Sequence, residues 1–177
     1  MKRILVVVML IAISLGANAQ SIPEFKNKVM LVDKDQSISN LESVTLTNYI
    51  KTKVGAGAVG LKVDDENSPI VFDAAAGKSF IVKIEPGVDP ESIVTLYKFT
   101  IEKKKRTIIT YATSISGMKD TKLPVMPLSF KKVQDGVYNI TAMKPLEEGE
   151  YVFIVSQPLT NTTISDVKGF AFSVAGK

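Results

Sequence analysis

The chain contains no cysteine, no histidine and no tryptophan among its 177 residues. Without histidine or cysteine, Ser-His-Asp and Cys-His catalytic relays cannot form, and neither can the usual shell of zinc ligands. Without cysteine there is also no disulfide bond and no N-terminal cysteine that could be acylated as in a lipoprotein. We therefore predict that the protein is not an enzyme and has no catalytic residues, no cofactor and no metal ion.

The N-terminus has the pattern of a cleavable signal peptide. Lys2 and Arg3 supply positive charge, residues 4–15 form an apolar run, and Ala17 and Ala19 give the small-x-small cleavage pattern. The apolar run is shorter than the roughly 20 residues that a helix needs to span a bilayer. We predict a signal peptide over residues 1–19, no transmembrane segment after cleavage, and a mature protein that is periplasmic or secreted to the cell surface.

Charge is nearly balanced in the predicted mature segment. Removing residues 1–19 from the 177-residue chain leaves 158 residues, enough for a single domain with a sizeable core. This segment holds 20 lysines and arginines, the 22 of the whole chain without Lys2 and Arg3, against 18 acidic residues. A balance so close to neutral argues against nucleic acid as a partner.

Apolar residues in the mature segment mostly recur at every second position, which is typical of β-strands. No stretch keeps a 3.6-residue period over three turns, and only one short helical turn is expected, with Asp89 as its N-cap and Pro90 as its first residue. The expected strands cover residues 28–32, 44–53, 58–63, 69–73, 79–84, 93–101, 107–116, 125–131, 137–143, 150–156 and 169–174.

Many short strands without intervening helices predict an all-β fold. We expect an antiparallel β-sandwich with immunoglobulin-like layers, formed by residues 20–177 as one domain. Pro124 and Pro127 interrupt the pattern. An alternative is therefore two small packed sandwiches, with a boundary near residues 119–127.

Residues 103–106 are the densest run of charge, and strand-like segments lie on both sides of them. We predict an antiparallel hairpin with a lysine-rich turn. One interpretation is a patch for an anionic partner, such as a lipid headgroup, an acidic glycan or nucleic acid. The other is a solvated hairpin tip that discourages edge-to-edge strand pairing. The residues concerned are Lys103, Lys104, Lys105 and Arg106.

Residues 55–60 read Gly-Ala-Gly-Ala-Val-Gly and do not resemble a core segment. Their missing side chains suit either a flexible hairpin loop or a close approach of two backbones. We include Gly55 and Gly57 in the predicted interaction surface.

Two clusters of carboxylates raise hypotheses about sites. Residues 64–66 are Asp-Asp-Glu on a polar loop, but the alternating Asp-x-Asp-x-Asp-Gly arrangement of a calcium loop is missing. Glu147, Glu148 and Glu150 match the residue types of a glycosidase acid and nucleophile. Neighbours on a turn seldom converge at the separation that glycosidases require, so we expect both clusters to be solvated turns.

Several segments together resemble a family of uncharacterised secreted β-sandwich proteins from Bacteroidota-type Gram-negative bacteria. The resemblance implies the fold and the compartment, and it supplies no catalytic residues. The matching segments are Pro23-x-Phe25-x-Asn27-Lys28-Val29, Ser68-Pro69-Ile70-Val71-Phe72, Asp89-Pro90 before Ile93-x-x-Leu96-Tyr97-Lys98, the 103–106 run, and Pro145-Leu146-x-x-Gly149-Glu150-Tyr151-Val152-Phe153.

These observations favour an exported, non-enzymatic β-sandwich that acts as a binding or interaction module of the cell envelope. Its partner would be an envelope protein or glycan whose identity the sequence does not give. One alternative is a carbohydrate-binding domain or a carboxylate-dependent glycan hydrolase, which needs acidic residues converging in one groove. Another is a structural subunit that polymerises by strand exchange, although no donor strand is obvious.

Overall fold

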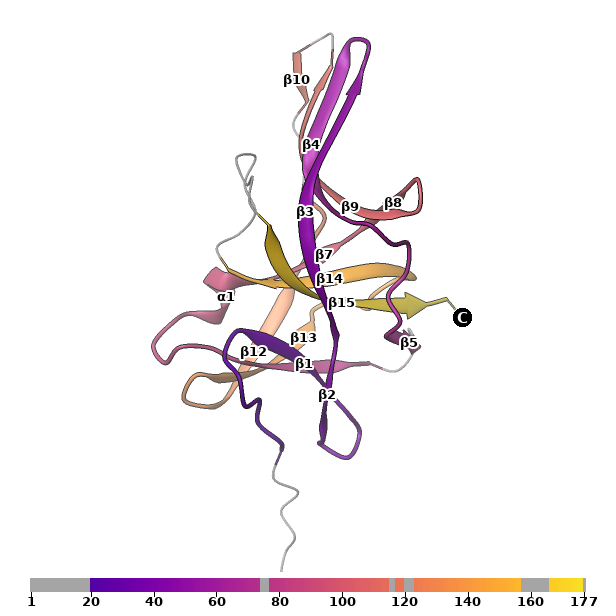
Figure 1. Ribbon diagram of the computed structural model, residues 1–177. Coiled ribbons are helices and arrows are strands. Elements are labelled where there is room, and N and C mark those ends of the chain that lie inside the picture. The colour runs from indigo at the N-terminus through magenta and orange to yellow at the C-terminus, as the bar shows by residue number, and fades with distance from the viewer. Residues whose placement is uncertain (1–19, 74–76, 115–116, 120–122, 157–165, 177) are drawn as a thin grey trace, which may run out of the picture.

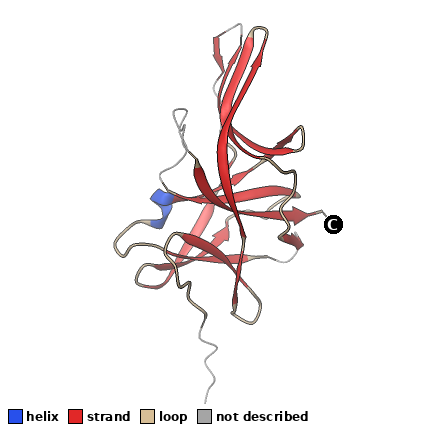
Figure 2. Ribbon diagram, in the orientation of Figure 1, coloured by secondary structure: helices blue, strands red, loops and turns tan. Residues whose placement is uncertain are grey.

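The computed structural model describes residues 20–73, 77–114, 117–119, 123–156 and 166–176. Within these residues the chain is all-β apart from one short helix (Figure 2), which confirms the predicted fold class. The predicted signal peptide lies outside the described residues. No helix in the described part of the chain is long and apolar enough to cross a bilayer.

The elements follow one another along the chain as short strands joined by turns. They are β1 (Lys28–Val32), β2 (Ile38–Asn40), β3 (Glu42–Lys53), β4 (Ala56–Val63), β5 (Val71–Asp73), β6 (Ser79–Lys83), α1 (Pro90–Ile93), β7 (Val94–Lys98), β8 (Thr100–Glu102), β9 (Lys105–Ser114), β10 (Gly117–Lys119), β11 (Val125–Met126), β12 (Leu128–Gln134), β13 (Val137–Ala142), β14 (Gly149–Val155) and β15 (Val167–Ala175).

The strands form two sheets. The smaller sheet has five strands in the order β12-β13-β6-β1-β2. The larger sheet has ten strands, with the order β10-β9-β4-β3-β15-β14-β7-β11, and β5 and β8 pair with β15 and β9 outside this path. Neighbouring strands are antiparallel except for β5, which runs parallel to β15.

The main core lies between the two sheets and is rich in aromatic rings. Phe172 of β15 stands 5.1 Å from Phe80 of β6 and 5.5 Å from Tyr151 of β14, measured between ring centroids. All three side chains are buried. Because Phe80 belongs to the smaller sheet and the other two to the larger one, these contacts join the layers of a sandwich.

The larger sheet curls on itself and encloses a second core. Along β14, Tyr151 and Phe153 face the main core, whereas Val152 and Ile154 face the second core, as the alternation of a strand requires. Strands β3, β4 and β9 cover this second core with side chains such as Leu61. Central strand β14 is therefore buried on both faces, and the curled sheet is a half-barrel.

The predicted helical turn is confirmed. The side chain of Asp89 accepts a hydrogen bond of 3.0 Å from the backbone amide of Glu91, and Pro90 occupies the first turn. The N-cap supplies an acceptor for an amide that the helix leaves without a partner. The helix is short because Val94 already has an extended backbone and begins β7.

The prediction of one long hairpin formed by residues 93–101 and 107–116 is wrong about the length of the hairpin. Strand β7 pairs with β14 and β11, and only the three residues of β8 pair with β9. The chain changes partners at Phe99, whose amide donates a hydrogen bond to the carbonyl of Glu150. Strand β9 instead pairs over most of its length with β4.

Strand β3 links two parts of the larger sheet. Residues 42–46 pair with β15, whereas residues 47–53 continue beyond it in a hairpin with β4. This hairpin projects from the body of the sandwich, and we call its residues 47–60 the arm (Figure 1). Strand β9 runs along the other edge of β4 and supports the arm.

Strands from both sides of residues 119–127 are hydrogen-bonded in both sheets. In the smaller sheet, β6 from the first half of the chain pairs with β13 from the second half. In the larger sheet, β3 pairs with β15. The two sheets therefore cannot be assigned one to each side of that segment, of which residues 120–122 lie outside the described part of the chain.

Candidate functional site: a lysine-lined pocket beside the arm

The lysine-rich turn that the sequence predicts exists between β8 and β9. Lys103 and Lys104 both have positive backbone φ angles, 51° and 63°. Two consecutive residues in this conformation make the tight turn whose twist matches that of the flanking strands. Glu102 and Lys105 are the paired residues that close the hairpin.

Arg106 does not belong to the surface patch, and that part of the prediction is wrong. Its side chain is fully buried, and both of its terminal nitrogens bind the carboxylate of Glu42 at 2.8 and 3.0 Å. It also pairs with Asp65, lies 3.5 Å from Glu150, and stacks over the ring of Phe99. Arg106 therefore holds the inside of the curled sheet together and cannot reach a partner.

The charge of Arg106 is retained despite its burial. Burial by itself lowers the pKa of the guanidinium, but the hydrogen bonds and charges of Glu42 and Asp65 outweigh this effect and hold its pKa above the ordinary value. Its Nε is buried with no hydrogen-bond partner among the described residues. The cluster thus sets one buried cation among three carboxylates, which the chain brings from β3, the loop after β4 and β14.

The glycine segment is part turn and part strand. Gly55 lies in the turn of the β3–β4 hairpin with φ 75°, but Gly57 belongs to β4, so the expectation of a loop over residues 55–60 is wrong beyond the turn. The alternative, a close backbone approach, is confirmed at Gly60. A Cβ there would overlap the carbonyl oxygen of Ile108 in the neighbouring strand, at a bulge between Val59 and Gly60.

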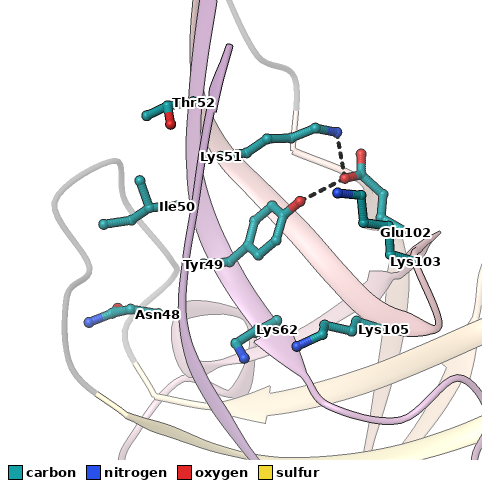
Figure 3. A pocket seen from close by; sticks show the side chains of 9 residues that line it. All are labelled: Asn48, Tyr49, Ile50, Lys51, Thr52, Lys62, Glu102, Lys103 and Lys105. Atoms are coloured by element: carbon teal, nitrogen blue, oxygen red, sulfur yellow. Dashed lines mark hydrogen bonds and ion pairs between the residues drawn. The ribbon is translucent and has the colours of Figure 1, made fainter.

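A pocket of about 470 Å³ lies between the arm and the β8–β9 turn. Figure 3 shows Tyr49 and Lys51 of β3 pointing toward Glu102 of β8, whereas Asn48 and Ile50 point the other way. This alternation follows from the two-residue period of the strand. The pocket is lined by Asn48, Tyr49, Ile50, Lys51, Thr52, Lys62, Glu102, Lys103 and Lys105.

Strand pairing explains how lysines from distant parts of the sequence meet. Lys62 of β4 stands opposite Thr47 of β3 on one side and Thr107 of β9 on the other. It therefore shares a face with Tyr49 and Lys51, two and four residues beyond Thr47. We call Lys51, Lys62, Lys103 and Lys105 the lysine set; the prediction named only two of them.

Two carboxylates partly neutralise the lysine set. Glu102 accepts hydrogen bonds from Lys51 at 2.6 Å and from the hydroxyl of Tyr49 at 2.7 Å. Asp64 accepts hydrogen bonds from Lys62 at 2.6 Å and from Lys105 at 2.5 Å. Each carboxylate is thus held by two donors, and four ammonium groups are set against two carboxylates. Lys103 forms no ion pair with any described residue.

The pKa values record a positive environment. Hydrogen bonds from Lys105 and Lys62 lower the pKa of Asp64 to about 2. In return, the hydrogen bond to Asp64 raises the pKa of Lys105, and the hydrogen bond to Glu102 raises that of Lys51. Lys51 and Lys105 therefore keep their protons at neutral pH and offer fixed positive charge rather than a free amine.

The carboxylates considered for calcium binding and glycoside hydrolysis have separate surroundings. Asp64 and Asp65 are each bound by a cation of the chain. In the second group, Glu147 pairs with Lys98, whereas buried Glu150 accepts hydrogen bonds from the amide of Ser68 and the hydroxyl of Ser173. Among the residues that the structure describes, no group of three or more potential ligands could hold a metal ion.

A second cleft, of about 820 Å³, opens at one end of the sandwich. Its walls include Phe72 of β5, Phe80 of β6 and Met143 after β13. It also contains two carboxylates, Asp73 and Glu148. These carboxylates are of the residue type that the glycan-hydrolase alternative requires.

Comparison of the chain with protein-family models, curated proteins and solved structures finds no match. The resemblance to secreted Bacteroidota-type proteins stays a prediction.

Proposed function

We propose that this chain is an exported, non-enzymatic binding module of the cell envelope, and that it binds an anionic group of an envelope component in the lysine-lined pocket. The observation that carries this proposal is the lysine set. Four lysines from β3, β4, the β8–β9 turn and β9 line one open pocket, in which they exceed the carboxylates. An anion entering the pocket would meet Lys103, which has no ion pair in the described structure.

The protonation of the lysines favours binding over catalysis. A lysine acts as a base or nucleophile only when its pKa is lowered far enough to free the amine. Here Lys51 and Lys105 have raised pKa values because each donates to a carboxylate. The pocket also has no histidine or cysteine to serve in their place.

The lysines of the pocket suit a ligand with several acceptor oxygens. Lysine presents a point charge with three donors, whereas arginine presents a planar fork that matches a carboxylate. The chain's one arginine beyond residue 3 is Arg106, and it is already engaged with Glu42. A phosphate- or sulfate-like group can collect donors from several directions, as the ammonium groups of Lys62, Lys103 and Lys105 would provide them.

The test is calorimetric titration with tripolyphosphate, a soluble anion, at low and high salt. We expect binding that weakens as the salt concentration rises, because exposed charges are screened. The Lys103→Gln/Lys105→Gln variant should bind about tenfold more weakly. The control is Lys26→Gln/Lys132→Gln, which removes two surface lysines far from the pocket, each in a single ion pair. Equal affinity of the two variants would contradict the proposal.

The carbohydrate-binding or glycan-hydrolase alternative remains a second proposal because the cleft at the end of the sandwich contains Asp73 and Glu148. Release of reducing sugars from envelope glycans, with loss of that activity in Asp73→Asn and Glu148→Gln, would support it. Absence of sugar release and of glycan binding by the unmodified protein would exclude it.

A further inference from the structure

The arm ends in aliphatic side chains that nothing in the described structure covers. Val54, in the turn after β3, is fully exposed to solvent, and Ile50 is 71% exposed. The arm projects away from the sandwich, and its turn lies at the far end of that part of the molecule, next to β10 (Figure 1). Such side chains at the tip of a projecting hairpin are costly to leave in water.

The exposed aliphatic groups continue into an apolar row across the arm. Ile50 is the cross-strand partner of Val59 on β4, and Val59 is the partner of Tyr111 on β9. Val59 and Tyr111 are half-buried. The arm therefore has two faces near its end, one apolar through Ile50, and one basic through Lys51, which points the opposite way in Figure 3.

We propose that the arm docks on an anionic lipid bilayer. Val54, at the tip of the arm, enters the interfacial layer, and the lysine set on one side of the arm binds lipid phosphate groups. This inference rests on the proposed function, because it names the source of the anion that the pocket binds. The physical reason is that attachment of a protein to a membrane surface combines burial of apolar side chains with attraction of basic residues to anionic headgroups.

Charge and area favour a bilayer over a second copy of the chain. A stable protein interface buries about 800 Å² on each partner, far more than two aliphatic side chains at a hairpin tip provide. Pairing of two arms through Ile50 would leave the basic face of each arm (Figure 3) uncovered, whereas anionic headgroups complement that face. A bilayer needs no large complementary surface, and it accepts a narrow tip.

The test is co-sedimentation of the purified mature protein with vesicles. We expect binding to vesicles of phosphatidylcholine with phosphatidylglycerol and little binding to phosphatidylcholine alone. The Val54→Ser variant changes a residue that does not line the pocket, keeps the pocket lysines, and should partition about tenfold less onto anionic vesicles. Its affinity for tripolyphosphate should not change. The control is Val125→Ser/Val133→Thr, which alters two exposed valines outside the arm.

Three results would overturn the inference. One is binding of tripolyphosphate without binding to anionic vesicles, and another is equal vesicle binding by the arm variant and the control. The third is concentration-dependent self-association that Val54→Ser abolishes, since that would identify a second copy as the occupant. Failure of the proposed function itself would look different, because the unmodified protein would then not bind tripolyphosphate.

Discussion

Both terminal nitrogens of Arg106 bind the carboxylate of Glu42, although 64 positions separate the two residues in the sequence. Arg106 is fully buried, and the side chain of Glu42 is 16% exposed. The pair joins the first residue of β3 to β9, and Asp65 and Glu150 complete the cluster. It fixes the curl of the larger sheet and thereby the position of the lysine-lined pocket above it.

Replacing Arg106 with methionine should destabilise the protein by about 3 to 5 kcal/mol. Methionine would leave the carboxylates of Glu42 and Glu150 buried without their cation. Urea unfolding followed by circular dichroism measures the change. Lys104→Met, in the exposed β8–β9 turn, is the matched control and should have little effect. Equal stability of the two variants would show that the buried cluster is not holding the sheet.

Gly60→Ala should destabilise the protein by about 1 to 3 kcal/mol, the range typical of substitutions that add atoms to a well-packed site. The new Cβ would overlap the backbone of Ile108, and a backbone cannot move aside as a flexible side chain can. Gly57→Ala is the control, since its Cβ would lie 3.3 Å from the hydroxyl of Thr113. It should change the free energy of unfolding by less than about 1 kcal/mol. Similar losses at both positions would contradict this account of the bulge.

Asp64 should titrate with a pKa of about 2, well below its ordinary value of 3.8, because Lys105 and Lys62 bind its carboxylate. A lowered folded-state pKa stabilises the protein above the unfolded-state pKa, and this contribution is lost as the pH falls from about 4 to about 2. Carbon-detected NMR of the side-chain carboxyl measures the midpoint. In Lys105→Met the midpoint should rise toward 3.8, and an unchanged midpoint would disprove the assigned cause.

Export should remove residues 1–19 and leave Gln20 as the first residue. Mass spectrometry of protein isolated from the envelope fraction of a Gram-negative host tests this cleavage. Ala17→Lys, which breaks the small-x-small pattern, should accumulate at the mass of the full chain. Recovery of the unmodified protein from the cytoplasm at full mass would contradict the predicted signal peptide.

Local sequence signals predicted the elements that depend on local chemistry. Strand β1 occupies the residues expected from their alternation, and Asp89 caps a single helical turn as its residue type favours. Lys103 and Lys104 form the turn predicted at the charged run. Strand β2 was missed because its three residues are too few to show a period.

The sequence did not reveal features that depend on strand pairing. Arg106 resembled the three lysines before it, and only the approach of Glu42 and Asp65 from elsewhere makes its burial tolerable. Of the four pocket lysines, the sequence analysis identified Lys103 and Lys105 but missed the other two. Lys51 and Lys62 lie near them only because β3, β4 and β9 pair in this register. The spacing of Tyr49 and Lys51, two residues apart and thus on one face of a strand, was the local signal that could have indicated Lys51.

The most direct test of the central claim is an amide NMR titration of the mature protein with tripolyphosphate. The account predicts that chemical-shift changes concentrate at the amides of Lys62, Lys103 and Lys105 and saturate with one equivalent bound. Changes spread equally over surface lysines such as Lys26 and Lys132, without saturation, would contradict a specific anion site in this pocket.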